Sequence, residues 1–357
     1  MDDRDLTSII AAPQHGPRPL PLFLEMLRSE TAQDEGRRRA ALAGLRRYQQ
    51  FPRHSRPAPP PAIAEAGRAQ LRDYGGSGRP VVFVPSLINP AAVLDLTAER
   101  SLLRWLARSR GLRTLLVDWG TPKVEERGRD IAGHVEDLLL PLLRTLEQPP
   151  VLVGYCLGGT MALAAARAAR AAAVALIAAP WRFAGFGEQT RADIARLWAQ
   201  AAPACRALGL VPMEVLQTGF WHLDPARTVA KYAGFANLDP ASDAAQAFVS
   251  LEDWANGGAP LTYAAGRDLF EELIAADRPG AGAWRVAGDA VAPEALGIPM
   301  VEFVSLSDRI VPAATAIGLP DHRALAAGHV GMVIGGRARD QLWTPLADWL
   351  NARTRDT

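Results

Sequence analysis

A cysteine set between glycines, where a hydrophobic strand passes directly into a helix, constrains this chain more than any other feature. The segment reads GYCLGG (154–159), follows the apolar stretch PPVLV (149–153) and leads into an alanine-rich helix. So sharp a turn strains the backbone of its central residue, and side chains two positions before and after it would collide. Glycine there removes the collisions. The pattern predicts a nucleophile elbow made by Gly154, Gly158 and Gly159, with Cys156 as the nucleophile.

The backbone around Cys156 would also supply groups that stabilise negative charge. The amide of Leu157 and the start of the following helix face the sulfur, favour the thiolate and offer a donor to a developing oxyanion. We expect a second donor from the loop at 85–90, and we choose the amide of Ile88. The alternative for Cys156 is a buried structural cysteine. That is the role we expect for Cys205, because no glycines flank it in the same way.

A cysteine nucleophile needs a base, and the base needs an acid to orient it. In a sheet of this type the chain order is nucleophile, acid, histidine. Asp308 follows the apolar segment 298–307, and His329 stands 21 residues later in AGHVG (327–331). Both therefore become the candidate acid and base. Asp289, Glu302 and Asp321 are fallback acids, and we expect His134 to lie on the surface of an amphipathic helix.

From residue 79 onward the chain alternates between short apolar strands and helical segments. Strands are expected at 79–85, 112–120, 149–156, 172–180, 298–308 and 322–329, and helices at 99–111, 131–147, 157–170 and 340–352. This alternation implies right-handed crossovers and a parallel sheet. We therefore predict an α/β fold in which helices flank a mostly parallel central sheet.

The segments outside this alternation divide the chain into four parts. Residues 1–79 predict a helical arm and a proline-rich linker, with the helices either packed on the outside of the core or free to bind a partner. Residues 80–180 and 298–357 would be the two parts of the core. Residues 181–297 lose the rhythm of strand and helix and are too long for a loop. We expect them to form an inserted helical cap.

Composition excludes several classes of function. The chain has 39 Lys+Arg against 38 Asp+Glu, with no basic run, so we expect no nucleic-acid partner. The sequence has no stretch of about 18 apolar residues that would predict a transmembrane helix. Its acidic N-terminus is unlike a signal peptide, so we expect a cytoplasmic location. Two cysteines and six scattered histidines predict neither a disulfide framework nor a metal site. The chain carries no nucleotide-binding fingerprint, and we expect no bound cofactor.

Several segments together resemble polyhydroxyalkanoate synthases, the cysteine-dependent acyltransferases of the α/β-hydrolase fold. VPSLINPAAVLDL (84–96) looks like that family's loop after the first core strand, and residues 100–122 look like the helix and strand that follow. GYCLGGT matches its Gly-X-Cys-X-Gly-Gly box, while LSDRIVP (306–312) and AGHVGMV (327–333) resemble the segments that carry its Asp and His. The box alone is similar to that of dienelactone hydrolases, which are much shorter.

The resemblance implies a function and a role for each candidate residue. Cys156 would hold an acyl chain taken from a 3-hydroxyacyl-CoA as a thioester. His329 would be the general base, and Asp308 would orient it or help to activate an incoming hydroxyl. CoA would enter as part of the substrate. The resemblance also implies a homodimer contact through the cap and, at this length, a separate partner subunit.

The chain departs from that family in ways that keep other functions open. The long N-terminal domain of the larger synthases is missing, and the cap does not match the familiar one. A first alternative is a cysteine-dependent hydrolase of esters, thioesters or lactones on the same scaffold. A second is a catalytically silent relative that binds partners or storage granules. Exclusion of water from the acyl-cysteine would separate a synthase from a hydrolase.

Overall fold

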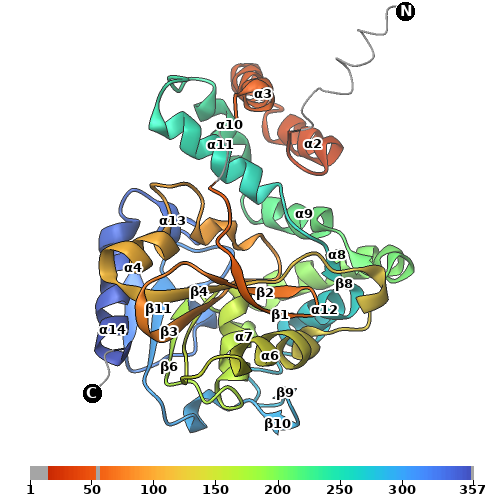
Figure 1. Cartoon of the computed structure of the whole chain (residues 1–357). Helices are drawn as coiled ribbons and strands as arrows, with labels where there is room; N and C mark the ends of the chain where they lie inside the picture. The colour runs from red at the N-terminus through yellow and green to blue at the C-terminus, as the bar shows by residue number, and fades with distance from the viewer. Residues whose placement is uncertain (1–14, 54–56, 355–357) are drawn as a thin grey trace, which may run out of the picture. The chain divides into compact units, whose positions relative to one another are not determined.

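The computed structural model describes residues 15–53 and 57–354, which fall into two compact units. The helical unit combines 15–53 with 216–257, and the sheet unit combines 57–215 with 258–354. Figure 1 shows the elements of both units. Each unit is described by itself below.

The sheet unit is built on an eight-stranded sheet with the strand order β1-β2-β4-β3-β5-β6-β11-β12. From β4 to β12 all neighbouring strands are parallel, whereas β2 pairs antiparallel with both β1 and β4. The mostly parallel sheet predicted from the sequence is therefore present. The strands are β1 Ala62–Ala66, β2 Ala69–Asp73, β3 Ser77–Val84, β4 Leu112–Asp118, β5 Val151–Tyr155, β6 Ala173–Ile177, β11 Met300–Ser305 and β12 His322–Leu325.

Helices flank this sheet, and their sequences explain where they begin and end. The side chain of Ser101 caps α4 (Leu102–Arg110) by accepting a hydrogen bond from the Arg104 amide, and Gly111 ends it in the left-handed conformation. In α7 (Leu157–Ala166) nine of ten residues are buried, since it contacts β5, β6 and β3. Because α7 starts directly after β5, the junction between them lies within the core.

The remaining helices of the sheet unit are mostly short. The α-helices are α5 Ile131–His134, α6 Leu140–Arg144, α8 Glu188–Leu208, α12 Tyr263–Arg267, α13 Gly331–Ile334 and α14 Thr344–Thr354. Three π-helical turns occupy η3 Val135–Leu139, η5 Asp268–Ala275 and η8 Arg339–Trp343. The 3-10 turns are η1 Ala91–Leu94, η2 Val124–Glu126, η4 Phe183–Phe186, η6 Pro293–Ala295 and η7 Ala313–Thr315. Two small antiparallel sheets pair β7 Leu210–Val211 with β8 Leu261–Thr262 and β9 Arg285–Val286 with β10 Asp289–Ala290.

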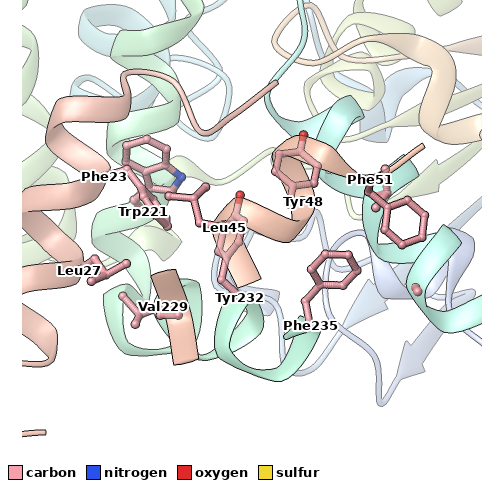
Figure 2. Packing of buried hydrophobic residues seen from close by; sticks show 12 residues of the cluster. Phe23, Leu27, Leu45, Tyr48, Phe51, Trp221, Val229, Tyr232 and Phe235 are labelled. Atoms are coloured by element: carbon pink, nitrogen blue, oxygen red, sulfur yellow. The ribbon is translucent and has the colours of Figure 1, made fainter. Parts of the chain in front are cut away.

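The helical unit has a hydrophobic cluster of its own. It contains α2 (Leu20–Glu30), α3 (Glu35–Gln50), α10 (Pro225–Phe235), α11 (Asp243–Ala255) and most of α9 (Met213–Leu223). Figure 2 shows side chains of the two chain segments turned toward one another, among them Phe23, Tyr48, Trp221, Tyr232 and Phe235. These side chains are at most 7% exposed. Burying rings of this size contributes roughly 2–3 kcal/mol each, so the cluster joins the segments firmly.

The structure differs from the sequence prediction in the segment 62–73, which the prediction assigns to the arm and linker. These residues form the hairpin of β1 and β2 at one edge of the sheet. Gly67 makes the turn, with φ 56°. The division into arm, core and cap stays a prediction, but residues 216–257 of the proposed cap belong to the helical unit together with the N-terminal helices. Among the described residues, no helix is long and apolar enough to cross a membrane.

Candidate active site

Cys156 occupies a strained turn between β5 and α7. Its φ of 56° and ψ of −134° lie in a region that residues other than glycine rarely adopt. A Cβ added at Gly154 would lie 2.2 Å from the Cα of Gly159, and one at Gly158 would lie 2.0 Å from the carbonyl oxygen of Val84. A Cβ at Gly159 would lie 2.2 Å from that of Ala179. All three glycines are thus required for the turn, which has the geometry expected of a nucleophile elbow.

Asp308 and His329, chosen from separate segments, lie in contact. His329 Nδ1 donates a hydrogen bond of 2.6 Å to Asp308 Oδ2. The other oxygen of Asp308 accepts from the amides of Ile310 (2.7 Å) and Val311 (3.0 Å), which holds the carboxylate in place. The Asp308 side chain is fully buried, and that of His329 is 8% exposed. A buried, fixed carboxylate can orient an imidazole and stabilise its charged form.

The His329 ring also interacts with Cys156. Burial lowers the pKa of His329, but the charges of Cys156 and Asp308 and hydrogen bonds to both outweigh burial and raise that pKa to about 10. The three side chains come from loops or turns that follow β5, β11 and β12, which are parallel strands of one sheet. This arrangement places an imidazole whose pKa is raised beside the sulfur of Cys156.

Tyr155 is a further part of the site that sequence reasoning missed. Its ring stacks on that of His329, with centroids 5.1 Å apart and planes 27° from parallel. Its hydroxyl donates to the backbone carbonyl of His329 over 3.4 Å. Burial, followed by the charges of Cys156 and Asp308, raises the pKa of Tyr155 well above its usual value. Its place directly before the nucleophile was the only signal in the sequence, and that position tolerates many residue types.

The two backbone amides predicted to stabilise an oxyanion differ in their surroundings. Leu157 is the first residue of α7, where backbone N–H groups have no acceptor within the helix. The Ile88 amide instead donates to Ser86 Oγ over 3.1 Å. Ile88 therefore has a partner in this structure, and both oxyanion roles stay predictions.

The fallback acids have other surroundings. Glu302 is buried and accepts hydrogen bonds from the amides of Ile317 (3.2 Å) and Leu319 (2.5 Å), with His322 Nδ1 3.0 Å from one of its oxygens. Asp321 pairs with Arg323, and Asp289 is exposed. None of the contacts described here for Glu302 and Asp321 is with His329.

His134 is buried, contrary to our expectation of a surface position. It is 1% exposed, and burial lowers its pKa to about 4. Its Nδ1 donates to the Asp130 carbonyl over 2.6 Å, and Arg68 Nη2 donates to its Nε2 over 2.8 Å. The helical pattern was correct, but long-range contacts cover the face on which His134 lies. Within residues 15–53 and 57–354, no three or more His, Cys, Asp or Glu side chains are grouped to hold a metal ion.

Comparison with curated proteins finds similarity to poly(3-hydroxyalkanoate) polymerases. No protein-family model matches it. The poly(3-hydroxyalkanoate) polymerase subunit PhaC of Haloferax mediterranei is 26% identical over 292 residues, which cover 77% of this chain and 59% of that protein. The protein of the same name from Haloarcula marismortui is 24% identical over 307 residues, covering 82% and 64%. That of Allochromatium vinosum is 24% identical over 293 residues, covering 77% and 81%.

This chain thus spans less than two thirds of the length of the two archaeal relatives. These comparisons confirm that the chain is similar to polyhydroxyalkanoate synthases, as its sequence motifs indicated. These relatives are polymerases by name.

Comparison with solved structures identifies the fold. An epoxide hydrolase from Bacillus megaterium aligns with a TM-score of 0.50 and 15% identity, covering 82% of this chain and 100% of the other. A carboxylesterase from Nitrososphaera gargenis aligns with a TM-score of 0.50 and 16% identity, covering 83% and 100%. At this identity the likeness concerns the fold alone. The α/β-hydrolase fold predicted from the sequence is confirmed.

Proposed function

We propose that this protein is an acyltransferase of the polyhydroxyalkanoate synthase type, with Cys156, His329 and Asp308 as its catalytic residues. The observation that carries the proposal is the strained turn at Cys156 with the buried His329–Asp308 pair beside it. Similarity to poly(3-hydroxyalkanoate) polymerases supplies the substrate class, a 3-hydroxyacyl-CoA. No bound cofactor is needed, because the thioester brings both the acyl group and its leaving group.

The reaction would proceed through an acyl-enzyme. The Cys156 thiolate attacks the thioester carbonyl, the C–S bond to CoA breaks, and protonated His329 gives its proton to the departing CoA thiolate. Neutral His329 then takes the proton from the hydroxyl of an incoming chain as that oxygen attacks the acyl-cysteine. An ester forms, and Cys156 leaves again as a thiolate. Asp308 would hold the His329 ring and stabilise its charge in both steps.

The remaining parts of the proposal concern partners and location. A homodimer through segment 181–297 and a separate partner subunit are proposed on the similarity to the synthases. The three relatives described above are named as polymerase subunits. We place the activity in the cytoplasm. Sedimentation of the purified chain would test the dimer, and restored turnover on addition of a second subunit would test the partner.

The deciding experiment incubates purified protein with 3-hydroxybutyryl-CoA. Free CoA is followed with a thiol reagent, while intact mass spectrometry and peptide mapping follow the protein. Release of CoA with an adduct on Cys156 that lengthens by repeating hydroxybutyryl units is the expected result. Cys205→Ser, which changes the other cysteine, is the matched control for Cys156→Ser.

Two other outcomes would contradict the proposal. Release of CoA with only free 3-hydroxybutyrate would identify a hydrolase. Absence of both release and adduct, in the presence of the partner subunit as well, would identify a catalytically silent relative.

A further inference from the structure

Two neighbours hold the edges of the His329 ring, and one of them changes chemically in the proposed reaction. Asp308 accepts a hydrogen bond from Nδ1, and the Cys156 side chain makes a second hydrogen bond with the ring. Once Cys156 carries an acyl group, its sulfur belongs to a neutral thioester, which is a weak hydrogen-bond acceptor. The ring then keeps its bond to Asp308 and loses the one to Cys156. A ring bonded at one edge can tilt about that bond.

Tyr155 restrains the same ring on its face. The two rings stack with centroids 5.1 Å apart and planes 27° from parallel, which is an attractive arrangement for aromatic rings. Both side chains are buried, so tilting the imidazole would push it into the tyrosine ring or open a gap in a packed interior. Because this contact is with the ring face and not with the sulfur, acylation of Cys156 leaves it in place.

The stacked rings come from elements of different rigidity. Tyr155 is the last residue of β5, which has β3 and β6 as neighbours on its two sides. His329 lies in the loop between β12, which ends at Leu325, and α13, which begins at Gly331. The Tyr155 hydroxyl also donates to the His329 carbonyl, but over 3.4 Å, which is long for a hydrogen bond. A central strand thus supports a loop residue, mainly through the stack.

We propose that Tyr155 is a positioning residue, which keeps the His329 ring aligned while Cys156 carries the acyl group. In that state His329 has to take the proton from the incoming hydroxyl, and a base that is out of place loses much of its effect on the rate. The role falls on the second half of the reaction, because both edges of the ring are still bonded in the first half. The acyl-enzyme rests on the proposed function, whereas the restraint on the ring rests on the stack alone.

The first test uses Cys156→Ala, which lacks the hydrogen bond from residue 156 and needs no substrate. Carbon-13 relaxation of the His329 ring gives its order parameter, for which about 0.85 is typical of a rigid backbone and below about 0.6 of a flexible one. We expect a rigid ring in Cys156→Ala and in Cys156→Ala/Tyr155→Phe, which keeps the stack. In Cys156→Ala/Tyr155→Leu the order parameter should fall below about 0.6. In Tyr155→Leu alone the ring should stay rigid, since both of its edges are bonded.

Phe83→Leu is the matched control for loss of a buried ring. Phe83 is fully buried in β3, the strand beside β5, and its replacement leaves the stack on His329 in place. Both leucine substitutions should lower the thermal midpoint, but in the Cys156→Ala background only Tyr155→Leu should free the ring. An equally rigid ring with and without Tyr155 in that background would overturn the proposal. Equal loosening of the ring by Phe83→Leu would overturn it as well.

The second test follows CoA release from 3-hydroxybutyryl-CoA by rapid mixing. In Tyr155→Leu the first CoA should leave within about threefold of the wild-type rate, while later release slows by at least about tenfold. Tyr155→Phe should restore later release, and equal slowing of both phases would contradict the positioning role. A wild type that releases no CoA would overturn the proposed function and leave the relaxation result intact. A wild type that polymerises, with a ring that stays rigid in Cys156→Ala/Tyr155→Leu, would overturn the positioning role alone.

Discussion

At the scale of single residues, Cys156 and His329 are linked through protonation. The folded protein raises the pKa of His329 from 6.5 to about 10, chiefly through the charge of Cys156 once burial is overcome. A raised histidine pKa stabilises the folded state fully below about pH 6.5, and this contribution is lost as the pH rises toward 10. Cys156 therefore contributes to the pH dependence of folding through His329.

Removing the Cys156 sulfur should change the titration of His329. In the wild type we expect a protonated His329 ring at pH 8, observed by NMR and assigned with His329→Gln. In Cys156→Ala the charge and the hydrogen bond from residue 156 are gone while burial remains, so the pKa should fall by more than one unit. An identical titration in both proteins would show that Cys156 does not act on the ring.

Replacing Cys156 by serine tests the nucleophile itself. The change is nearly isosteric, so the fold should be kept, but a serine hydroxyl is far harder to ionise. We expect the rate of CoA release to fall by at least about a thousandfold, the scale seen when a nucleophile is lost. Cys205→Ser should keep the wild-type rate. Full activity of Cys156→Ser would remove Cys156 from the mechanism.

The sequence was enough to choose Cys156, Asp308 and His329 because local chemistry marks each one. The flanking glycines mark the cysteine, and strand ends followed by polar residues mark the other two. Tyr155 and the burial of His134 were missed for a common reason. Each depends on which distant segment covers that side chain, and no local pattern records this.

At the scale of elements, the distance between two helix backbones determines whether a glycine on one of them can be replaced by a larger residue. The Cα of Gly44 in α3 faces α10 so closely that an added Cβ would lie 1.8 Å from the Tyr232 carbonyl oxygen. Gly234, in α10 itself, has open space around an added Cβ. The two glycines therefore offer opposite outcomes for the same substitution in one pair of helices.

Gly44→Ala should destabilise the helical unit by about 3 kcal/mol, since backbone atoms must separate. Gly234→Ala should stabilise it by about 0.5–1 kcal/mol, since alanine favours a helix. Urea unfolding followed by far-ultraviolet circular dichroism measures both. Unchanged stability of Gly44→Ala would mean that α3 and α10 do not approach as described.

Strands and helices could be predicted wherever the sequence carries a strong local pattern of apolar or capping residues. The core strands are continuous apolar runs, and α4 carries a capping serine and a terminal glycine, so both were expected from the sequence. The hairpin of β1 and β2 has the weak, alanine-rich pattern AIAEA beside a proline-rich stretch. Its strand character comes from pairing with β4 rather than from propensity.

At the scale of the whole molecule, each unit has its own core. In the helical unit Asp253 joins the two chain segments, accepting from the Tyr48 hydroxyl (2.6 Å) and from Arg53 Nε and Nη2 (both 3.1 Å). Sequence reasoning did not group these segments, because more than 160 residues separate them and no local pattern reports such a contact.

Asp253→Ala should therefore loosen the helical unit selectively. We expect faster hydrogen exchange in 15–53 and 216–257, with exchange in the strands of the sheet unit unchanged. Asp239→Ala, at an exposed position of the same unit, is the control. Equal acceleration in both units would mean that they unfold as one.

The helical unit joins segments made at different times. Helix α3 ends at Gln50, and the segment that completes its hydrophobic cluster begins at Leu216. At a synthesis rate of roughly 5–20 residues per second, about 10–30 seconds pass between the two. During this interval the ribosome carries two amphipathic helices whose aromatic faces have no partner from their own unit. The need for chaperones in the cell, and the amount of protein lost to aggregation during overexpression, should increase with the time between synthesis of the two segments.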